Sequence, residues 1–114
     1  MKPQSCKAKG RKLQQFVRDA VLRVFPDLTE RDVKSTGMGQ AGDDLQLSSK
    51  AFSYFPYAVE CKNLAKVVVY KWFEQRIPKE GNVLLVVKAN QKEPLAVVTL
   101  AHFMELIKNV RTAG

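Results

Sequence analysis

The sequence predicts a protein of mixed α/β class with the element order helix, three strands, helix, two strands, helix. Two observations support this. Apolar residues recur at helical spacing at both ends of the chain, and apolar runs of strand length lie between turn residues in its middle. A chain of 114 residues is long enough for one hydrophobic core but too short for two. We therefore expect residues 1–114 to form a single domain.

The terminal helices have the clearest pattern. Residues 10–25 form an amphipathic helix that ends before Pro26, and a final helix begins near residue 100. Residues 65–77 are ambiguous, because their β-branched run favours a strand while their apolar spacing favours a helix. Their length and interspersed polar residues favour the helix. Residues 1–9 are expected to be a flexible basic arm that lies along a phosphate backbone, with an ordinary disordered terminus as the alternative.

Five segments have the composition of strands. Residues 83–88 are continuously apolar, as in a buried strand, and residues 95–99 pair with them across a turn. Three shorter segments precede the central helix, at residues 32–36, 44–48 and 58–63. The sequence therefore predicts three strands before the central helix and two after it.

The loop at residues 37–42 matches the glycine spacing of a dinucleotide-binding loop, GxGxxG. That motif requires a helix directly after the loop, whereas a predicted strand follows here. We therefore interpret it as a turn or mobile loop and expect no organic cofactor.

Residues 44–48 alternate between polar and apolar side chains. Because successive side chains of a strand point to opposite faces, Leu45 and Leu47 should face the core while Asp44 faces away from it. Asp43 falls on the buried side by the same count. Asp44 is therefore the preferred functional acid of this strand.

A short Glu-x-Lys motif lies in the strand predicted at residues 58–63. Glu60 and Lys62 project on one face, and Cys61 turns toward the core. If this strand neighbours that of Asp44, the two carboxylates and the backbone carbonyl of Cys61 supply the oxygen ligands that Mg²⁺ prefers. Lys62 would then orient a water molecule or offset developing negative charge, which is the chemistry of phosphodiester hydrolysis. The alternative is an exposed ion pair between Glu60 and Lys62.

The net charge of +8 is unevenly distributed. Residues 1–25 carry seven basic and one acidic side chain, residues 26–60 three and six, and residues 61–114 nine and four. Basic ends thus flank an acidic middle. This pattern favours a protein that binds a polyanion and holds a cation, with a solvated basic surface as the alternative.

Other site types find little support. Two cysteines and a single histidine, His102, are too few for a disulfide scaffold, a zinc site or a Ser-His nucleophile. No apolar run is long enough to span a bilayer, and the N-terminal residues lack the apolar segment of a signal peptide. We expect a cytoplasmic protein with no membrane partner.

The motifs together resemble those of the PD-(D/E)xK nuclease superfamily, and within it the archaeal-type Holliday junction resolvases and their phage-encoded relatives. The resemblance covers about residues 9 to 110. The matching motifs are Lys9-Gly10 with Gln14 four positions after the glycine, Gly42-Asp43-Asp44-Leu45-Gln46-Leu47-Ser48, Phe55-Pro56 and Glu60-Cys61-Lys62-Asn63.

The resemblance implies a restriction-endonuclease-like fold, in which a central mixed five-stranded sheet is flanked by helices. It also implies a homodimer that makes paired, symmetric nicks in a four-way DNA junction, with Mg²⁺ as cofactor and Mn²⁺ as a substitute. A phage-encoded protein would act in the host cytoplasm. Other branched or linear DNA substrates, and a basic DNA-binding module without catalysis, remain the alternatives.

The resemblance also assigns residues to roles. Asp44, Glu60 and Lys62 would be catalytic, with Gln14 where the archaeal enzymes carry a glutamate that reaches the metal. An amide offers a carbonyl oxygen but no charge, and Gln15 is the alternative if the helix is rotated. The residues expected to contact DNA are Lys9, Arg11, Lys12, Arg18, Ser35, Ser48 and Ser49.

Overall fold

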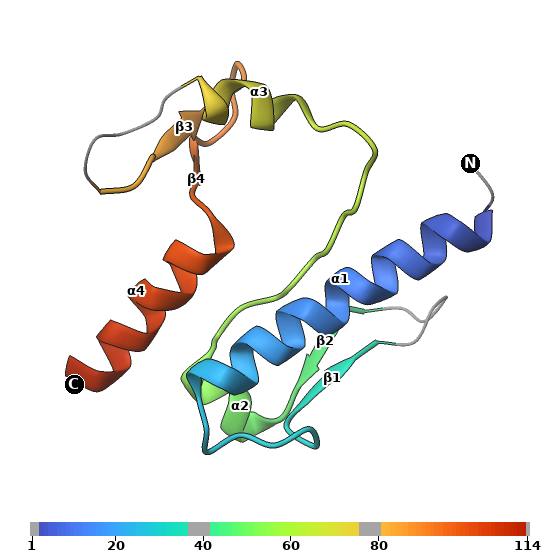
Figure 1. The fold of residues 1–114 in the computed structure, drawn as a ribbon. Coiled ribbons are helices and arrows are strands. Elements are labelled where there is room, and N and C mark those ends of the chain that lie inside the picture. The colour runs from blue at the N-terminus through green and yellow to red at the C-terminus, as the bar shows by residue number, and fades with distance from the viewer. Residues whose placement is uncertain (1–2, 37–41, 76–80, 114) are drawn as a thin grey trace.

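The computed structural model describes residues 3–36, 42–75 and 81–113. Within these ranges the fold is mixed α and β, with four helices and two small two-stranded antiparallel sheets (Figure 1). The elements, in chain order, are α1 (Pro3–Val24), β1 (Val33–Ser35), β2 (Leu45–Leu47), α2 (Ser49–Tyr54), α3 (Val68–Glu74), β3 (Leu85–Val87), β4 (Leu95–Val97) and α4 (Leu100–Ala113). The mixed class predicted from the sequence is confirmed. A five-stranded sheet is not found among the described residues.

Helix α1 begins at Pro3, seven residues earlier than the sequence pattern indicated. Proline is well tolerated in the first turn of a helix, where its missing N–H has no partner to lose. Residues 3–9, expected as a flexible arm, are therefore helical. The helix ends as expected before Pro26, and the N–H of Phe25 closes its last turn on the carbonyl of Val21 at 3.0 Å.

The first sheet pairs β1 with β2 in antiparallel register, with Val33 opposite Leu47 and Ser35 opposite Leu45. Val33 and Leu45 are buried while Gln46 between the two leucines is exposed, which confirms the predicted alternation. Most of the glycine-rich loop that joins these strands, residues 37–41, lies outside the described residues.

The core lies between α1, the β1–β2 sheet, α2 and the first half of α4. Its buried apolar residues are Val17, Val21, Phe25, Leu28, Val33, Leu45, Ala51, Phe55 and Met104. Ser48 begins α2 by accepting a hydrogen bond from the N–H of Ala51 at 3.0 Å, as N-cap serines do. This short helix was not predicted from the sequence.

The third predicted strand, at residues 58–63, is an extended segment without strand pairing. A single backbone bond joins it to the sheet, from the N–H of Asp44 to the carbonyl of Val59 at 2.9 Å. The backbone N–H of Cys61, two residues further on, donates to the carboxylate of Asp44 instead of to a backbone carbonyl. The regular ladder is interrupted there, because a side chain replaces the backbone acceptor.

Helix α3 and the hairpin of β3 and β4 form a second part of the fold, which we call the outer unit. Val86 pairs with Ala96 at the middle of the hairpin, and Gln91 in its turn adopts a left-handed φ of 60°. Figure 1 shows the outer unit away from α1, reached through the extended chain that follows α2. None of the described residues between 62 and 99 belongs to the core or packs against it.

The helix predicted at residues 65–77 is observed as α3, which covers Val68–Glu74 and so begins three residues later than expected. Residues 76–80 lie outside the described part. The hairpin itself confirms the two predicted late strands. Among the described helices, none has the length and apolar character needed to cross a bilayer.

Candidate metal centre

Asp44 lies directly before β2 and is fixed by both its backbone and its side chain. Its carbonyl accepts from the N–H of Thr36 at 2.9 Å, which extends the β1–β2 ladder by one residue. Its carboxylate oxygen Oδ2 accepts from the backbone N–H of Cys61 at 2.5 Å. Among the described residues no donor occupies the other oxygen, Oδ1. One oxygen therefore holds the Glu60 segment in place while the second is free to bind a ligand.

Glu60 and Lys62 flank Cys61 and lie on the same side of the extended segment. The ammonium nitrogen Nζ of Lys62 is 3.3 Å from Oε1 of Glu60, and the two side chains are 72% and 62% exposed, respectively. The ion pair is thus open to solvent and contributes little to stability. The ion pair holds the ammonium group of Lys62 next to the carboxylate of Glu60.

The thiol of Cys61 reports on both acids. Partial burial raises the pKa of Cys61, and the negative charges of Asp44 and Glu60 raise this pKa further. Both carboxylates are therefore close enough to Cys61 to act on the same thiol. The raised pKa favours the protonated thiol, which is less nucleophilic than a thiolate.

The segment carrying this motif also forms one wall of an open pocket of about 390 Å³. Leu13 and Val17 of α1 form a second wall, and Phe103 and Met104 of α4 form a third. The lining is mainly apolar, so this pocket fixes the segment against the two helices while Glu60 and Lys62 remain at its rim.

Asp43 plays a different part from its neighbour. Its side chain is exposed, and its backbone carbonyl accepts a hydrogen bond from the hydroxyl of Thr36. The preference for Asp44 over Asp43 thus agrees with the geometry, although Asp43 is not buried as the strand count suggested. β2 begins at Leu45, after both residues, so the alternation of the strand does not extend to Asp43.

Gln14 is turned into the protein, with 8% of its surface exposed, whereas Gln15 is exposed. The hydroxyl of Ser35 donates a hydrogen bond to Oε1 of Gln14 at 2.7 Å, linking α1 to the end of β1. Asn63 adds a second link, because its side-chain amide donates to the carbonyl of Lys9 at 3.4 Å. The start of α1 is thereby tied to β1 and to the motif segment.

The donor set suits a hard divalent cation in part. Asp44 and Glu60 offer carboxylate oxygens and Cys61 a backbone carbonyl, which are the ligand types of Mg²⁺. Gln14 uses its amide oxygen for Ser35, so it is not free to bind metal in this arrangement. No group of three or more His, Cys, Asp or Glu side chains converges within the described ranges. Such a site would rest on two carboxylates, the backbone carbonyl of Cys61 and water.

The basic residues of α1 divide between its faces. At 3.6 residues per turn, Arg11 and Arg18 lie on the flank beside Gln14, and Lys9 and Lys12 lie about half a turn away. The guanidinium of Arg18 contacts Oδ1 of Asp19 at 3.0 Å, which offsets its charge. Arg11 is exposed on the Gln14 flank, whereas Lys9, whose carbonyl accepts from Asn63, is exposed next to the motif segment.

The three serines expected near DNA have separate environments. The hydroxyl of Ser35 is engaged by Gln14, and that of Ser48 donates to Oδ1 of Asp32 at 2.7 Å while it caps α2. Both hydrogen-bonding roles of the Ser48 hydroxyl are thus used inside the protein. Ser49 is exposed at the first position of α2.

One cluster was missed by sequence reasoning. Besides Ser48, the carboxylate of Asp32 accepts from the backbone N–H of Thr29 at 2.9 Å and from the Thr29 hydroxyl at 3.3 Å. These bonds lower the pKa of Asp32, with the Thr29 backbone bond first and the Ser48 bond second among the causes that lower it. The preference of Ser48 for a helix N-cap was the signal that could have located this cluster.

No protein-family model, curated protein or solved structure matches the chain.

Proposed function

We propose that this protein is a metal-dependent, structure-specific DNA endonuclease that hydrolyses phosphodiester bonds in branched DNA. The observation that carries the proposal is the hydrogen bond from Cys61 to Asp44, because it brings the carboxylate of Asp44 beside the Glu60–Lys62 pair. The acid of one segment thus contacts the residue that separates the acid and the lysine of the other. The motif resemblance to PD-(D/E)xK nucleases supports the same reading, with a four-way junction as the expected substrate.

In this proposal Asp44 and Glu60 hold Mg²⁺ through carboxylate oxygens, with the backbone carbonyl of Cys61 as a further ligand. When bound, the cation would polarise a phosphoryl oxygen and make a water molecule more acidic. Lys62 would leave its contact with Glu60, orient the attacking water and offset the negative charge that develops on the phosphate. Gln14 would act through Ser35, as a support for the site and not as a ligand.

The resemblance implies a restriction-endonuclease-like sheet of five strands, of which this proposal keeps the part formed by β1, β2 and the Glu60 segment. The bond between Asp44 and Val59 supports it, since this contact is the kind that a regular ladder between β2 and the Glu60 segment would repeat. The proposal also includes a homodimer, because symmetric incision of a two-fold substrate is most simply achieved by two copies of one site.

The basic surface of α1 would bind phosphates and not bases, so binding would depend on DNA shape and on salt. Arg11 and Lys9 flank Gly10, near the point where Asn63 ties the motif segment to the helix. This surface adjoins the candidate metal centre, as a nuclease requires.

One observation favours a second candidate, a basic DNA-binding module without catalysis. No group of three or more His, Cys, Asp or Glu side chains lies together among the described residues, and the Glu60–Lys62 ion pair is well exposed. Such a module would bind DNA in a salt-sensitive manner and be indifferent to metal.

A panel of DNA substrates distinguishes these functions. The purified chain is incubated with a four-way junction, a flap, a nicked duplex and a linear duplex, each with Mg²⁺, with Mn²⁺ and with EDTA. Paired nicks on the junction, dependent on metal, support a resolvase. Metal-dependent cutting of the other substrates supports a nuclease of different specificity, and binding without any product under all conditions supports the binding module.

A further inference from the structure

The outer unit exposes apolar residues on both faces of its hairpin. The register places Leu85, Val87, Leu95 and Val97 on one face and Leu84, Val86 and Ala96 on the other. Leu84 and Val86 are 62% and 59% exposed, which leaves one face open. On the other face Leu95 is 62% exposed, while Leu85, Val87 and Val97 are half-buried. Strands that are apolar on both faces are typical of sheets covered from both sides, and a two-stranded hairpin is barely stable alone. The outer unit therefore requires a cover.

Helix α3 adds to the same surface. Val68 and Trp72 are four residues apart, so they share one face of the helix, and they are 61% and 46% exposed. The half-buried residues Val69 and Phe73 lie on the neighbouring face. A helix of this composition normally packs its apolar side against another element.

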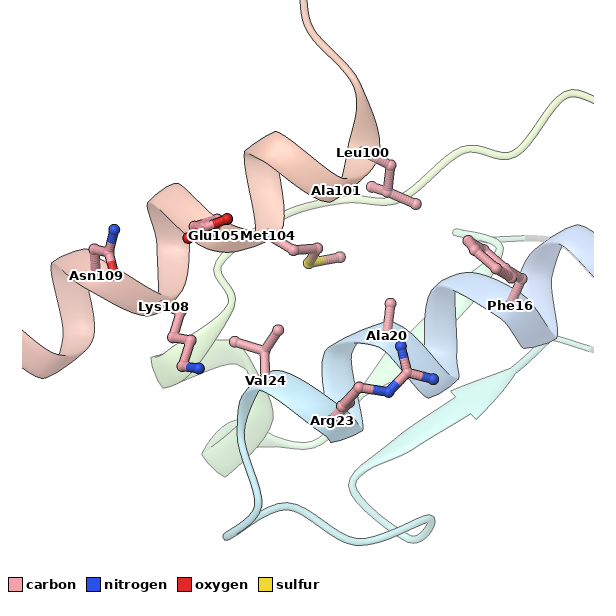
Figure 2. A pocket seen from close by; sticks show the side chains of 10 residues that line it. All are labelled: Phe16, Ala20, Arg23, Val24, Leu100, Ala101, Met104, Glu105, Lys108 and Asn109. Atoms are coloured by element: carbon pink, nitrogen blue, oxygen red, sulfur yellow. The ribbon is translucent and has the colours of Figure 1, made fainter. Parts of the chain in front are cut away.

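A second uncovered surface lies between α1 and α4, as an open groove of about 390 Å³. Figure 2 shows Phe16 of α1 and Leu100 of α4 at one end, with Met104 reaching down toward Ala20 between the helices. Phe16 is 61% exposed. The rim carries charges of both signs, from Arg23 and Glu105. The groove thus has the apolar floor and polar rim of a docking site.

The amount of exposed surface indicates how large the missing cover is. The chain exposes 9093 Å², whereas a folded monomer of 12.9 kDa exposes about 6,300 Å². The excess is about 2,800 Å², which is comparable with the area that each partner loses in a large obligate interface. The radius of gyration of 15.9 Å likewise exceeds the value of about 13 Å for a compact chain of this length. An area of this size is what a second copy of the chain would cover.

We propose that two copies of this chain exchange their outer units, so that α3 and the hairpin of each copy pack in the α1–α4 groove of the other. Each chain carries both an outer unit and a groove. In a two-fold exchange the outer unit of each copy covers the groove of the other, so the dimer is closed. The exposed segment at residues 62–67, which holds the outer unit away from its own core, provides the connection between the two halves. The exchange goes beyond the proposed nuclease activity and does not depend on it.

The single tryptophan of the chain, Trp72, makes the exchange measurable. Sedimentation of the full chain should give twice the chain mass of 12.9 kDa, and dilution should dissociate it. Trp72 emission should shift to the red in the same concentration range, as its partly exposed ring loses the partner's groove. A chain that is monomeric at every concentration overturns the proposal. This holds whether the Trp72 emission stays at long wavelength, stays at short wavelength because the outer unit folds back on its own chain, or moves to short wavelength only when DNA is added.

Complementation tests the surfaces themselves. Phe16→Asp puts a charge in the groove and Trp72→Asp puts one on the outer unit, so each variant alone should be monomeric. The control is Phe52→Asp, on the exposed side of α2, which should remain dimeric. An equimolar mixture of the first two variants should regain dimer, because one of the two exchanged contacts is then intact. Circular dichroism of each variant checks that it is folded. Dimers that survive both substitutions, or a mixture that stays monomeric while the wild type dimerises, overturn the exchange.

Discussion

The backbone N–H of Cys61 donates a hydrogen bond to Oδ2 of Asp44, with 2.5 Å between nitrogen and oxygen. This bond joins two segments that are separated by α2 in the sequence. It fixes the carboxylate of Asp44 against the peptide that carries Glu60 and Lys62, and it interrupts the strand pairing that the sequence pattern predicts. The same contact thus creates the candidate site and limits the sheet.

The reactivity of Cys61 tests this contact without any assay of activity. Because burial and the charges of Asp44 and Glu60 raise the pKa of the thiol, alkylation by iodoacetamide at pH 8 should be slower than for a free cysteine. In a Cys6→Ser background, Asp44→Asn should move the midpoint of the pH–rate profile to lower pH. The neighbouring Asp43→Asn is the control and should leave the midpoint in place. Equal shifts in both variants would show that Asp44 is not beside Cys61.

The bond between Ser35 and Gln14 should contribute measurably to stability, since Gln14 is buried. Ser35→Ala leaves an amide oxygen without its donor, and we expect a loss of about 1 to 2 kcal/mol in the free energy of unfolding. A double-mutant cycle with Gln14→Leu, followed by urea denaturation, should give a coupling energy of about 1 kcal/mol. Gln15→Leu, one position along on the exposed side, serves as the control. A coupling energy near zero would mean that the bond does not form in solution.

Asp32 predicts a specific acid dependence. Its pKa is lowered in the folded protein, by the Thr29 N–H first and by the Ser48 hydroxyl next, so its contribution to stability is present above the unfolded pKa. That contribution is lost as the pH falls through the folded pKa, which places the loss below about pH 4. Asp32→Asn should flatten the pH dependence of the unfolding midpoint in this range. Glu30→Gln, an exposed carboxylate in the same loop, should preserve it; an unchanged slope in Asp32→Asn would refute the network.

Sequence patterns located the local elements better than their assembly. The 3.6-residue period identified α1 and α4, and alternation correctly placed Leu45 inside and Gln46 outside, because both depend on which face of one element is buried. The limits of α1 and α3 were wrong by several residues. For α1 the reason is that Pro3 is accepted at a helix start, which periodicity does not report. Patterns of this kind carry no information on what each face packs against.

The site was predictable where it depends on residue type and not where it depends on long-range hydrogen bonds. Asp44, Glu60 and Lys62 stand out by spacing, and the structure brings them to one region. That Gln14 would be engaged by Ser35, and that Ser48 would cap α2 and hold Asp32, follows only once α1, β1 and β2 are placed together. The interrupted ladder at Cys61 is likewise a tertiary effect.

The faces of α1 predict unequal contributions to DNA binding. Arg11 lies on the flank near Gln14, so Arg11→Gln should weaken binding to a four-way junction and reduce the slope of log K against log salt by about one. Lys12→Gln removes the same charge about half a turn away and should change both quantities less. Fluorescence anisotropy across a salt series measures both. If Lys12→Gln has the larger effect, the DNA lies on the opposite face of the helix.

Cleavage of a four-way junction by matched acid variants is the most direct test of the candidate metal centre. With Mg²⁺, the wild type should make paired nicks, while Asp44→Asn and Glu60→Gln should each lower the cleavage rate by about a hundredfold or more. Junction binding by both variants, measured by anisotropy, should stay within a few-fold of the wild type, and Asp43→Asn should still cut. Wild-type cleavage rates in both Asp44→Asn and Glu60→Gln, or no metal-dependent product from the wild type, would contradict a nuclease site built on Asp44 and Glu60.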